Sequence, residues 1–400
     1  MNETPRANRP HIALFGRTNT GKSSLINALT NQELALVSEI NGTTTDPVYK
    51  SMEILPLGPV VLIDTAGLDD NSELGSLRIR KSMEVLNKTD IVILVADASA
   101  GLTSIEHDFI NKIKSRRLPL LVLFNKADLI DQTPVCNEPH LIVSAKTRLN
   151  IDEALSLLGK MKPTHEDKFK LVGDLVQPRD IVILVTPIDK AAPKGRLILP
   201  QQQVIRDLLE SDCITLIVKE NELKEAIESL SKKPKLVITD SQVFLKAAAD
   251  TPKDVNLTSF SILFARYKGD LEVYIAGIRA LERLKDGDKI LIAEGCTHHK
   301  SCDDIGTVKL PRWIRQYSGK RLEFIATSGN TFPQNIRDYA LVLMCGSCML
   351  NRQEVEYRLD KVKQDHIPIL NYGMAIAHVQ GILRRSLQMF PSLLNQLDEE

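Results

Sequence analysis

Short apolar runs alternate with polar stretches along the chain, and this pattern predicts buried β-strands separated by helices. In the first part, apolar runs of strand length lie at Ile12–Phe15, Val60–Ile63, Ile91–Ala96, Leu120–Phe124 and Leu141–Val143. Continuous apolar runs of this length are typical of strands that are buried on both faces of a parallel sheet. The stretch Ser24–Leu29, which follows the first run, is expected to be a helix.

The same alternation continues through the rest of the chain. In the middle part, we predict strands at Ile181–Val185, Ile214–Val218 and Leu236–Thr239, with helices at Gln201–Leu209 and Glu222–Leu230. In the first of these helices, one apolar face is expected from Val204, Ile205, Leu208 and Leu209. In the last part, we predict strands at Phe260–Phe264, Lys289–Ala293 and Ala340–Met344, and a helix at Leu271–Leu284. Strands that alternate with helices predict small, mainly parallel sheets.

A polar, proline-broken stretch, Lys162–Asp167, is a candidate linker after the first part. At ~150 residues per domain, the chain length suggests two or three domains. We therefore predict a three-domain α/β chain. The expected boundaries are residues 1–165, 166–255 and 256–400.

The stretch Gly16–Ser23, GRTNTGKS, matches the phosphate-binding pattern G-x-x-x-x-G-K-[ST]. Gly16 and Gly21 permit backbone angles that let successive N–H groups face a phosphate chain. Lys22 can reach the terminal phosphates, and the Ser23 hydroxyl can bind Mg²⁺. Because the loop lies between a predicted strand and a predicted helix, a phosphate would meet the positive end of the helix dipole.

Further polar motifs follow the predicted strands of the first part. Asp64-Thr65-Ala66-Gly67 places a carboxylate before a glycine at a strand end, an arrangement that holds Mg²⁺ through water and senses the terminal phosphate. Asn125-Lys126-Ala127-Asp128 and Ser144-Ala145-Lys146 follow later strands, and the hydroxyl-rich stretch Asn41–Asp46 lies between the first two motifs. These features complete the prediction of a P-loop nucleotide-binding domain, which the resemblance described next identifies as a GTPase domain, followed by two smaller α/β domains.

With these motifs in this order, residues 10–160 resemble the translation-factor-like GTPases. The resemblance implies that Asn125 and Asp128 recognise guanine, with the Asp128 carboxylate accepting from the ring N–H and the exocyclic amine. It implies that Ser144 and Ala145 support the base. The nucleotide-binding residues expected from this family are Gly16, Asn19, Gly21, Lys22, Ser23, Ser24, Asn125, Lys126, Asp128, Ser144 and Ala145. Those expected to act in hydrolysis are Lys22, Thr44, Asp64 and Gly67.

Leu68 stands where Ras-like enzymes carry a water-orienting glutamine, which predicts slow intrinsic hydrolysis. Together with Asn19 and the sequence GTTTD, this resembles the GTPases of the Era and tRNA-modification type. The resemblance implies that Asn19 binds K⁺ near the phosphates, that Thr44 contacts Mg²⁺ beside Ser23, and that two paired G domains complete the site. The alternative for Asn19 is an ordinary loop asparagine that satisfies backbone groups.

Two cysteine-containing turns follow predicted strands in the last part. One reads Glu294-Gly295-Cys296-Thr297-His298-His299, with Cys302 close behind, and the other reads Cys345-Gly346-Ser347-Cys348. If the two strands are parallel neighbours, both turns lie at the sheet edge where open α/β sheets bind ligands. We favour a metal site here over buried thiols or a redox pair, whereas Cys213, far from these turns in sequence, is predicted to be a buried filler.

The thiolates of Cys296, Cys345 and Cys348 are soft ligands that suit either an iron–sulfur cluster or zinc. A cubane cluster with three thiolates would leave one iron for a labile or foreign ligand. Zinc with His298 as the fourth ligand would be a closed structural site. Cys296 and Cys345 lie farther apart than the ~15–20 residues usual between the cysteine pairs of structural zinc sites.

Across all three segments the chain resembles the GTPases that mature FeFe-hydrogenases, the HydF family. The resemblance implies a 4Fe–4S cluster on Cys296, Cys345 and Cys348, and a transient two-iron precursor with CO and CN ligands. It also implies a homodimer formed by the middle domain. The implied partners are two radical-SAM maturation enzymes and the apo FeFe-hydrogenase.

Met344 departs from the family pattern, because the family carries a histidine before the final Cys-x-x-Cys. Met344 is expected in the core, which leaves the fourth cluster position open. His298 matches the family position and is the first candidate. The other candidates are Asp303, Asp304, water, an incoming ligand and the nearby Cys302 and His299.

Composition narrows the possible partners and compartment. Formal net charge is zero and aromatic residues make up 4% of the chain, so nothing indicates a broad surface for nucleic acid or membranes. No apolar run approaches the ~20 residues that span a membrane. The N-terminal ten residues lack the apolar segment of a secretory signal. We expect a cytoplasmic protein with cysteines that are not in disulfides.

The interpretation that joins both sites is a GTP-gated maturation scaffold whose only catalysis is GTP hydrolysis. One alternative is a ribosome- or tRNA-associated, K⁺-dependent GTPase with a structural zinc in its last domain, although neutral charge argues against it. A third is a redox GTPase that uses Cys345 and Cys348 as a dithiol pair. That hypothesis leaves the Cys296 turn without a purpose.

Overall fold

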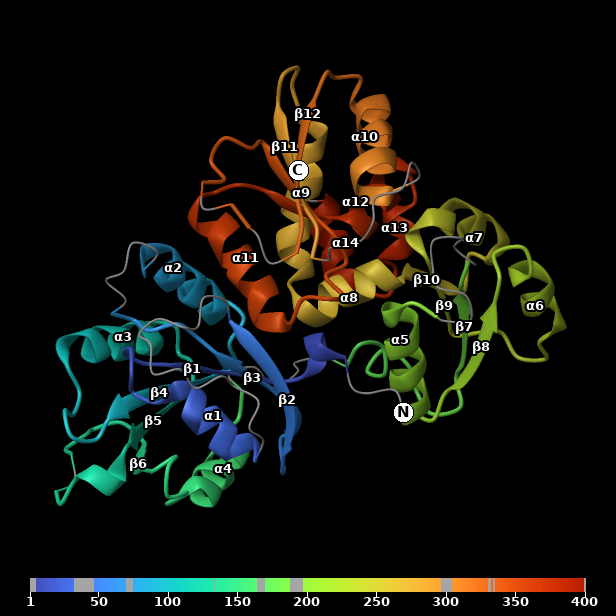
Figure 1. The fold of residues 1–400 in the computed structure, drawn as a ribbon. Helices are drawn as coiled ribbons and strands as arrows, with labels where there is room; N and C mark the ends of the chain where they lie inside the picture. Colours follow the sequence, from blue (N-terminus) through green and yellow to red (C-terminus); the bar gives the residue numbers. More distant parts are fainter. Residues whose placement is uncertain are drawn as a thin grey trace. The chain divides into compact units, whose positions relative to one another are not determined.

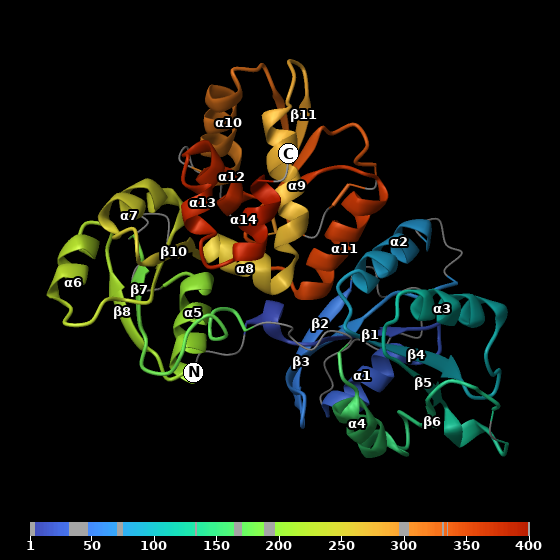
Figure 2. The ribbon, with the colours of Figure 1, turned by 180° about the vertical axis from the view of Figure 1, so that it is seen from behind.

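The structure is a computed structural model that describes residues 5–31, 47–69, 75–132, 134–163, 170–187, 197–295, 304–329, 332–333 and 335–398. It divides into two compact units, Met1–Glu166 and Asp167–Glu400. The division falls inside the predicted linker Lys162–Asp167. Figures 1 and 2 show the elements of each unit from opposite sides.

The first unit is built on a six-stranded sheet with the order β2-β3-β1-β4-β5-β6. Only β2 runs antiparallel, paired with β3, and the other neighbours are parallel. The strands are β1 (His11–Phe15), β2 (Val48–Ile54), β3 (Gly58–Asp64), β4 (Ile91–Asp97), β5 (Leu120–Asn125) and β6 (His140–Ile142). The strands predicted for this part are confirmed, and β2, whose polar residues alternate with apolar ones, was missed.

Helices cover both faces of this sheet. The helices are α1 (Lys22–Thr30), α2 (Gly75–Leu86), α3 (Ser104–Ser115) and α4 (Ile151–Lys160), with 3₁₀ turns at Arg6–Asn8 and Ala127–Leu129. Apolar side chains of α1 and α4 form one core with Ile12 and Leu14 of β1. Those of α2 and α3 form another with Ala13 and Phe15. Because successive residues of β1 enter opposite cores, the strand is apolar from Ile12 to Phe15.

The second unit begins with a four-stranded parallel sheet in the order β10-β9-β7-β8. Its elements are β7 (Ile181–Val185), α5 (Leu199–Glu210), β8 (Ile214–Val218), α6 (Leu223–Ser229), β9 (Leu236–Thr239), a 3₁₀ turn (Ser241–Val243), α7 (Phe244–Asp250) and β10 (Asn256–Ser259). The predicted boundary at residue 255 falls immediately before β10. The strands and helices predicted here are confirmed. The predicted apolar face of α5 is wrong at Leu209, which is 60% exposed.

The predicted strand Phe260–Phe264 is wrong, because these residues begin helix α8 (Phe260–Lys268). The Ser259 hydroxyl caps this helix by accepting from the Ile262 N–H at 3.3 Å. Most residues of α8 are buried, and its first six residues are apolar apart from Ser261. A short apolar run of this kind does not distinguish a buried helix from a buried strand.

The last sheet is also parallel, with the order β12-β11-β13-β14. Its elements are α9 (Leu271–Glu282), β11 (Lys289–Ala293), a π-helical turn (Ile305–Lys309), α10 (Leu310–Ser318), β12 (Glu323–Thr327), β13 (Leu341–Met344), α11 (Arg352–Gln364), β14 (Ile369–Asn371), α12 (Tyr372–Val379), α13 (Leu383–Ser386) and α14 (Pro391–Asp398). The predictions of β11, β13 and α9 are confirmed.

The two sheets of the second unit share one apolar core, which explains why they form one compact unit. The Arg385 guanidinium adds hydrogen bonds from α13 to the carbonyls of Pro252, Lys253 and Val255, just before β10. Cys213 is 8% exposed in the core beside α5, so its prediction as a buried residue is confirmed. None of the helices in the described ranges has the length and apolar character needed to cross a bilayer.

Candidate functional sites

The phosphate loop connects β1 to α1 and needs glycine at both ends. Gly16 and Gly21 have φ angles of 154° and 87°. A Cβ on Gly16 would lie 2.2 Å from the Val95 carbonyl oxygen, and one on Gly21 would lie 2.3 Å from Nδ2 of Asn125. The loop is therefore held close to the ends of β4 and β5, as its motif predicts.

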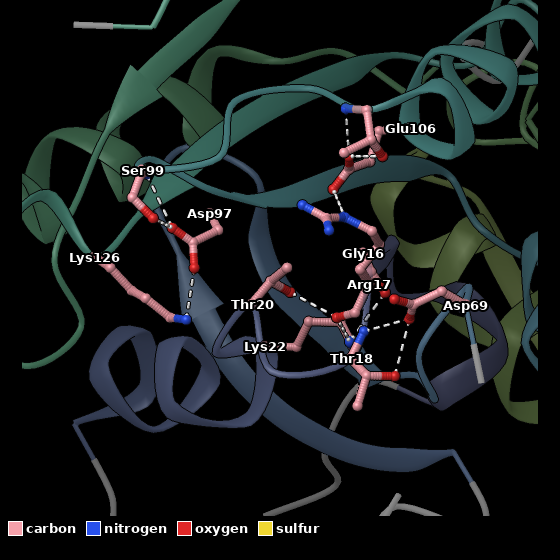
Figure 3. Close-up of polar contacts among 11 residues, drawn as sticks. Gly16, Arg17, Thr18, Thr20, Lys22, Asp69, Asp97, Ser99, Glu106 and Lys126 are labelled. Carbon is pink, nitrogen blue, oxygen red and sulfur yellow. Dashed lines mark hydrogen bonds and ion pairs between the residues drawn. The ribbon is translucent and has the colours of Figure 1, made fainter. Parts of the chain in front are cut away.

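Lys22 begins α1 and turns its ammonium group back over the loop (Figure 3). Its Nζ donates to the carbonyls of Gly16 at 3.0 Å and Arg17 at 2.8 Å. Burial lowers the pKa of Lys22 to about 8, although the carboxylates of Asp64, Asp69 and Glu106 act in the opposite direction. A buried ammonium group whose hydrogen bonds within the described residues go to neutral carbonyls is suited to an anionic ligand, which would bind it more strongly than those carbonyls do.

Ser23 and Asp64 come together where a phosphate-bound metal is expected. The Ser23 hydroxyl donates to Oδ2 of Asp64 at 2.6 Å. Asp64 ends β3 and is 2% exposed, and its Oδ1 has no hydrogen-bond partner within the described residues. Burial raises the pKa of Asp64, while Ser23 and Lys22 oppose the rise. A hydroxyl beside a buried, incompletely satisfied carboxylate fits the oxygen ligands of Mg²⁺.

The segment after Asp64 packs directly on the phosphate loop. The Asp69 carboxylate accepts from the Thr18 N–H at 2.6 Å and from its hydroxyl at 2.9 Å (Figure 3). A Cβ on Gly67 would lie 2.3 Å from the Thr18 hydroxyl oxygen, so only glycine allows this approach. The Leu68 side chain is buried in the core beside α2 and α3. Sequence reasoning missed Asp69, which no motif distinguishes from its neighbours.

The predicted base-recognition residues converge at the ends of β5 and β6. The buried Asn125 amide donates to the Thr20 carbonyl at 2.9 Å and accepts from the Ala145 N–H at 3.0 Å. The Ser144 hydroxyl donates to Asp128 at 2.6 Å, and this hydrogen bond lowers the pKa of the exposed Asp128 carboxyl. Asp128 is thus kept ionised, as acceptance from two guanine N–H groups requires.

The sequence analysis missed two ion pairs in this unit, one at the phosphate loop and one beside the predicted base-recognition residues (Figure 3). Lys126, at φ 68°, places Nζ 2.7 Å from Oδ2 of Asp97, at the end of β4. Arg17 Nε lies 2.9 Å from Oε1 of Glu106, which is fully buried. Glu106 also accepts from the N–H and hydroxyl of Thr103, forming the capping box of α3. The T-x-x-E spacing was the available signal for this box.

The remaining predicted nucleotide residues are placed only in part. Asn19 adopts a left-handed conformation with φ 63°, and Ser24 lies in the first turn of α1. Thr44 and the rest of the Asn41–Asp46 stretch lie outside the described residues.

In the second unit, β11 and β13 are parallel neighbours, and Ala293 pairs with Met344. The turns that follow them therefore leave the same sheet edge, as predicted. The Gly295 N–H donates to Sγ of Cys345 at 3.0 Å, which joins the first turn to the second. The other predicted residues of the first turn, Cys296, Thr297, His298, His299, Cys302 and Asp303, lie outside the described residues.

The Cys345–Cys348 turn directs backbone donors toward its sulfurs. The N–H of Ser347, which has a φ of 55°, donates to Sγ of Cys345 at 3.4 Å. Burial and the neighbouring Cys345 raise the pKa of the Cys348 thiol. Lys268 and hydrogen bonds from the N–H groups of Cys348 and Met349 act to lower the same pKa.

Lys268, at the end of α8, lies behind this turn and was missed by sequence reasoning. It is 2% exposed, and its Nζ donates to the carbonyls of Ser347, Cys348 and Leu350. Met344 is 1% exposed in the core, as predicted, so its side chain does not take the place of the family histidine.

The described part of the chain, which excludes residues 296–303, brings together no group of three or more His, Cys, Asp or Glu side chains suited to a metal ion. It does contain two thiols at one sheet edge with N–H donors aimed at sulfur. This donor set fits a thiolate-bound cluster or a soft metal, provided that further ligands come from the neighbouring turn.

Comparison with known families matches most of the chain in three segments. Residues 11–126 match the model of the family described as 50S ribosome-binding GTPase. Residues 171–269 match the hydrogen maturase F dimerization domain, and residues 272–389 match the hydrogen maturase F tetramerization domain. The predicted fold is confirmed: a P-loop GTPase domain precedes further α/β domains with mainly parallel sheets.

Two curated relatives each match about two fifths of this chain or less. The tRNA modification GTPase MnmE of Bordetella petrii is 34% identical over 144 residues, covering 36% of this chain and 31% of the relative. GTPase Der of a Sulfurihydrogenibium species is 34% identical over 180 residues, 40% of each chain. This chain thus spans less than half the length of either relative. A structure of Aquifex aeolicus Era shares 20% identity at a TM-score of 0.35, covering 52% of this chain and 93% of that one, and supports no conclusion.

Proposed function

We propose that this chain, which belongs to the hydrogen maturase F (HydF) family, is a GTP-hydrolysing scaffold that delivers the two-iron precursor of the FeFe-hydrogenase active site. In this proposal the last domain binds a 4Fe–4S cluster, and the two-iron precursor is its cargo. The matches to both hydrogen maturase F domains, which together span most of the second unit, support the family assignment. The phosphate-loop residues of the first unit and the two cysteine turns of the second support the assignment of GTP hydrolysis to one domain and cluster binding to another.

In the first unit, each side chain takes one part of the nucleotide. Lys22 binds the terminal phosphates in place of the loop carbonyls that it now contacts. Ser23 and Thr44 bind Mg²⁺, and Asp64 holds the ion through water. Asp128 accepts hydrogen bonds from guanine. Asn125, Ser144 and Ala145 hold the loops around the base in place through their hydrogen bonds. Adenine lacks the matching pair of donors, so the site selects GTP.

Hydrolysis in this proposal is slow and depends on K⁺. Leu68 is buried and apolar, so it cannot orient the attacking water as the glutamine of Ras-like enzymes does. A K⁺ ion bound through Asn19 supplies positive charge near the phosphates instead. We expect the rate of GTP hydrolysis to be higher in KCl than in NaCl of equal concentration. Equal rates would contradict the role of Asn19.

In the second unit, Cys345 and Cys348 are two of the proposed cluster ligands, and Cys296 is the third. His298 is the first candidate for the fourth position. Asp304 is a weaker candidate, because its Oδ1 already accepts from the N–H and hydroxyl of Thr307. When bound, the cluster supplies a redox-active iron centre beside which the cargo is held. The chain's own groups orient the thiolates and donate N–H groups to their sulfurs.

Delivery requires partners, which this proposal takes to be two radical-SAM maturation enzymes and the apo FeFe-hydrogenase. The matched domains are described as dimerization and tetramerization domains, which supports assembly of several copies, with a homodimer as the basic unit. Nucleotide state would act through the loops at residues 41–46 and 64–70. The contact between Asp69 and Thr18 is one that a terminal phosphate would have to rearrange.

The observation that carries the cluster proposal is the hydrogen bond from Gly295 to the Cys345 sulfur. It joins the two turns that are separated in sequence by more than a whole helix and strand. Amide donors to sulfur are a general means by which proteins orient cluster ligands and tune their electronic properties. A purely structural pair of buried cysteines has no need of this convergence.

Anaerobic reconstitution with iron and sulfide tests the proposal. We expect about four irons per chain and an EPR signal on reduction, as for a 4Fe–4S cluster. Cys345→Ala should lose both. Cys213→Ala is the matched control, because Cys213 is equally a free thiol but lies in the core beside α5. A colourless chain that holds one zinc and rejects iron would overturn the proposal in favour of a structural zinc site.

A further inference from the structure

A buried ammonium group lies directly behind the Cys345–Cys348 turn. Lys268 Nζ is 3.1 Å from the Ser347 carbonyl oxygen, 3.2 Å from that of Cys348 and 2.6 Å from that of Leu350. Burial of a charge is costly unless hydrogen bonds compensate it. Three carbonyls from one short turn provide that compensation.

These contacts fix the direction of the backbone amides as well. A trans peptide unit is planar, and its C=O and N–H point in opposite directions. When the carbonyls of Ser347 and Cys348 face Lys268, the N–H groups of the same two peptide units, on Cys348 and Met349, face away from it. In this form of the turn, the Ser347 N–H donates to the Cys345 sulfur at 3.4 Å. Lys268 therefore holds the turn in the form that presents donors to sulfur.

The charge itself is poorly screened. Lys268 Nζ lies 5.5 Å from the centre of the Phe264 ring, on the same helix, and the side chain is 2% exposed. Salt and water screen a buried charge much less than an exposed one. Its field therefore extends to groups bound at the turn.

We propose that Lys268 is a positioning residue that holds the Cys345–Cys348 turn with its N–H groups toward sulfur and raises the reduction potential of the cluster bound there. The part that concerns potential rests on the proposed function. Reduction adds negative charge to a cluster, and a nearby cation and N–H donors stabilise the more negative state. Lys268 itself binds neither iron nor cargo.

The experiment compares Lys268→Met with Lys268→Arg, which keeps the charge, and with Lys246→Met, which removes a lysine charge from the exposed face of α7. In the metal-free full-length chain, amide hydrogen exchange is measured across residues 345–351. We expect exchange in Lys268→Met to be roughly tenfold faster, because the turn loses its charged donor. Lys268→Arg and Lys246→Met should stay close to the wild type.

In the reconstituted chain, EPR measures the ratio of reduced to oxidised cluster at a fixed applied potential. We expect the ratio in Lys268→Met to fall about tenfold, which equals 59 mV for a one-electron couple. Lys268→Arg should restore most of it, a result that a merely space-filling role would not give. If Lys268→Met does not fold, Lys268→Gln removes the same charge while keeping a donor, and the same fall is expected.

The outcomes separate the two proposals. A loaded wild type whose reduced-to-oxidised ratio is unchanged, within about twofold, in the neutral variants overturns the inference about potential. Unchanged hydrogen exchange in Lys268→Met overturns the positioning role. A wild-type chain that takes up no iron overturns the proposed function, and the effect on potential with it, whereas the exchange result in metal-free protein still decides the positioning role.

Discussion

In the first unit, the phosphate loop leaves β1 and is braced by side chains from several neighbouring strands and helices. Arg17 pairs with Glu106 of α3, and the Asn125 amide at the end of β5 donates to the Thr20 carbonyl. In the last sheet, the turn at Cys345 also leaves a central parallel strand, but it is held through backbone carbonyls, three of them bound by Lys268 and that of Cys345 by the Asn371 amide. The two sites thus occupy equivalent sheet edges and are stabilised by different means.

The difference follows from what each site has to hold. A nucleotide presents several chemically distinct parts, so its site needs side chains from many elements, each with its own specificity. The cluster proposed for the second site would present sulfur and iron to a small number of thiolates, so a turn with correctly directed N–H groups would be sufficient. We therefore expect substitutions at the first site to change specificity. Substitutions at the second site should change the amount of cluster bound or its reduction potential.

The largest expected effect is at the base-recognition end of the first site. Asp128→Asn replaces the acceptor for both guanine donors with a group that also donates. We expect GTP affinity to fall by roughly 1,000-fold, since one guanine donor then faces an amide N–H group and is left unpaired. Xanthosine triphosphate, which presents a carbonyl in place of the exocyclic amine, should bind the variant better than GTP does. Fluorescence titration with both nucleotides measures the change.

Asp131→Asn is the control for this substitution. Asp131 is an exposed aspartate close to the same loop in sequence, and we expect it to leave both affinities unchanged. An Asp128→Asn chain that keeps its preference for GTP would break the comparison, because specificity would then not depend on this side chain.

A smaller effect is expected where the two cysteine turns meet. Gly295→Ala places a Cβ 2.6 Å from Cγ of Leu350, at the far end of the Cys345–Cys348 turn. Relief of this overlap costs ~1–3 kcal/mol and moves the turns apart. We expect the iron content of the reconstituted chain to fall by more than about half, since such a cost shifts binding by tenfold or more. Metal analysis after gel filtration measures this loss.

Gly346→Ala is the matched control within the same site. Its Cβ would lie 3.3 Å from the Ser261 hydroxyl oxygen, a contact that a small movement of a serine side chain can relieve. Iron content in this variant should stay near the wild-type value. If both variants lose iron equally, the loss reflects general sensitivity of the turn and not the approach of Gly295 to its neighbour.

The two sites also differ in how much of each could be predicted from the sequence. The phosphate loop, Asp64 and the base-recognition motifs are contiguous in sequence, and each follows a strongly apolar strand, so both fold and chemistry were predictable. The strand assignment at Phe260–Phe264 failed because most of α8 is buried. Its apolar run has no helical period to detect.

Residues that act across the sequence were the ones missed. Glu106, Asp97 and Lys268 each become significant only when the fold brings a second element within hydrogen-bond distance. A single lysine at the end of an apolar run gives no sign that its ammonium is buried behind a turn about eighty residues later. Packing, which these residues depend on, is decided by the whole chain and not by local propensity.

The smallest expected effect is a pH dependence of GTP affinity that arises from the charge of Lys22. Comparing GTP with guanosine, which has no phosphates, isolates it. Burial sets the pKa of Lys22 at about 8 in the nucleotide-free chain. Below this pH the ammonium is charged and ready for phosphate, so GTP affinity should vary little. Above it, the Lys22 side chain of the free protein is increasingly neutral and must take up a proton when GTP binds, so GTP affinity should fall by up to about tenfold per pH unit.

Guanosine, which lacks phosphates, is the matched control ligand. Its affinity should remain constant between pH 7 and about 9. Isothermal titration in buffers of different ionisation enthalpy would detect the proton uptake directly. A GTP affinity that is flat across this range would show that Lys22 stays charged without a ligand, and that the carboxylates of Asp64, Asp69 and Glu106 outweigh its burial.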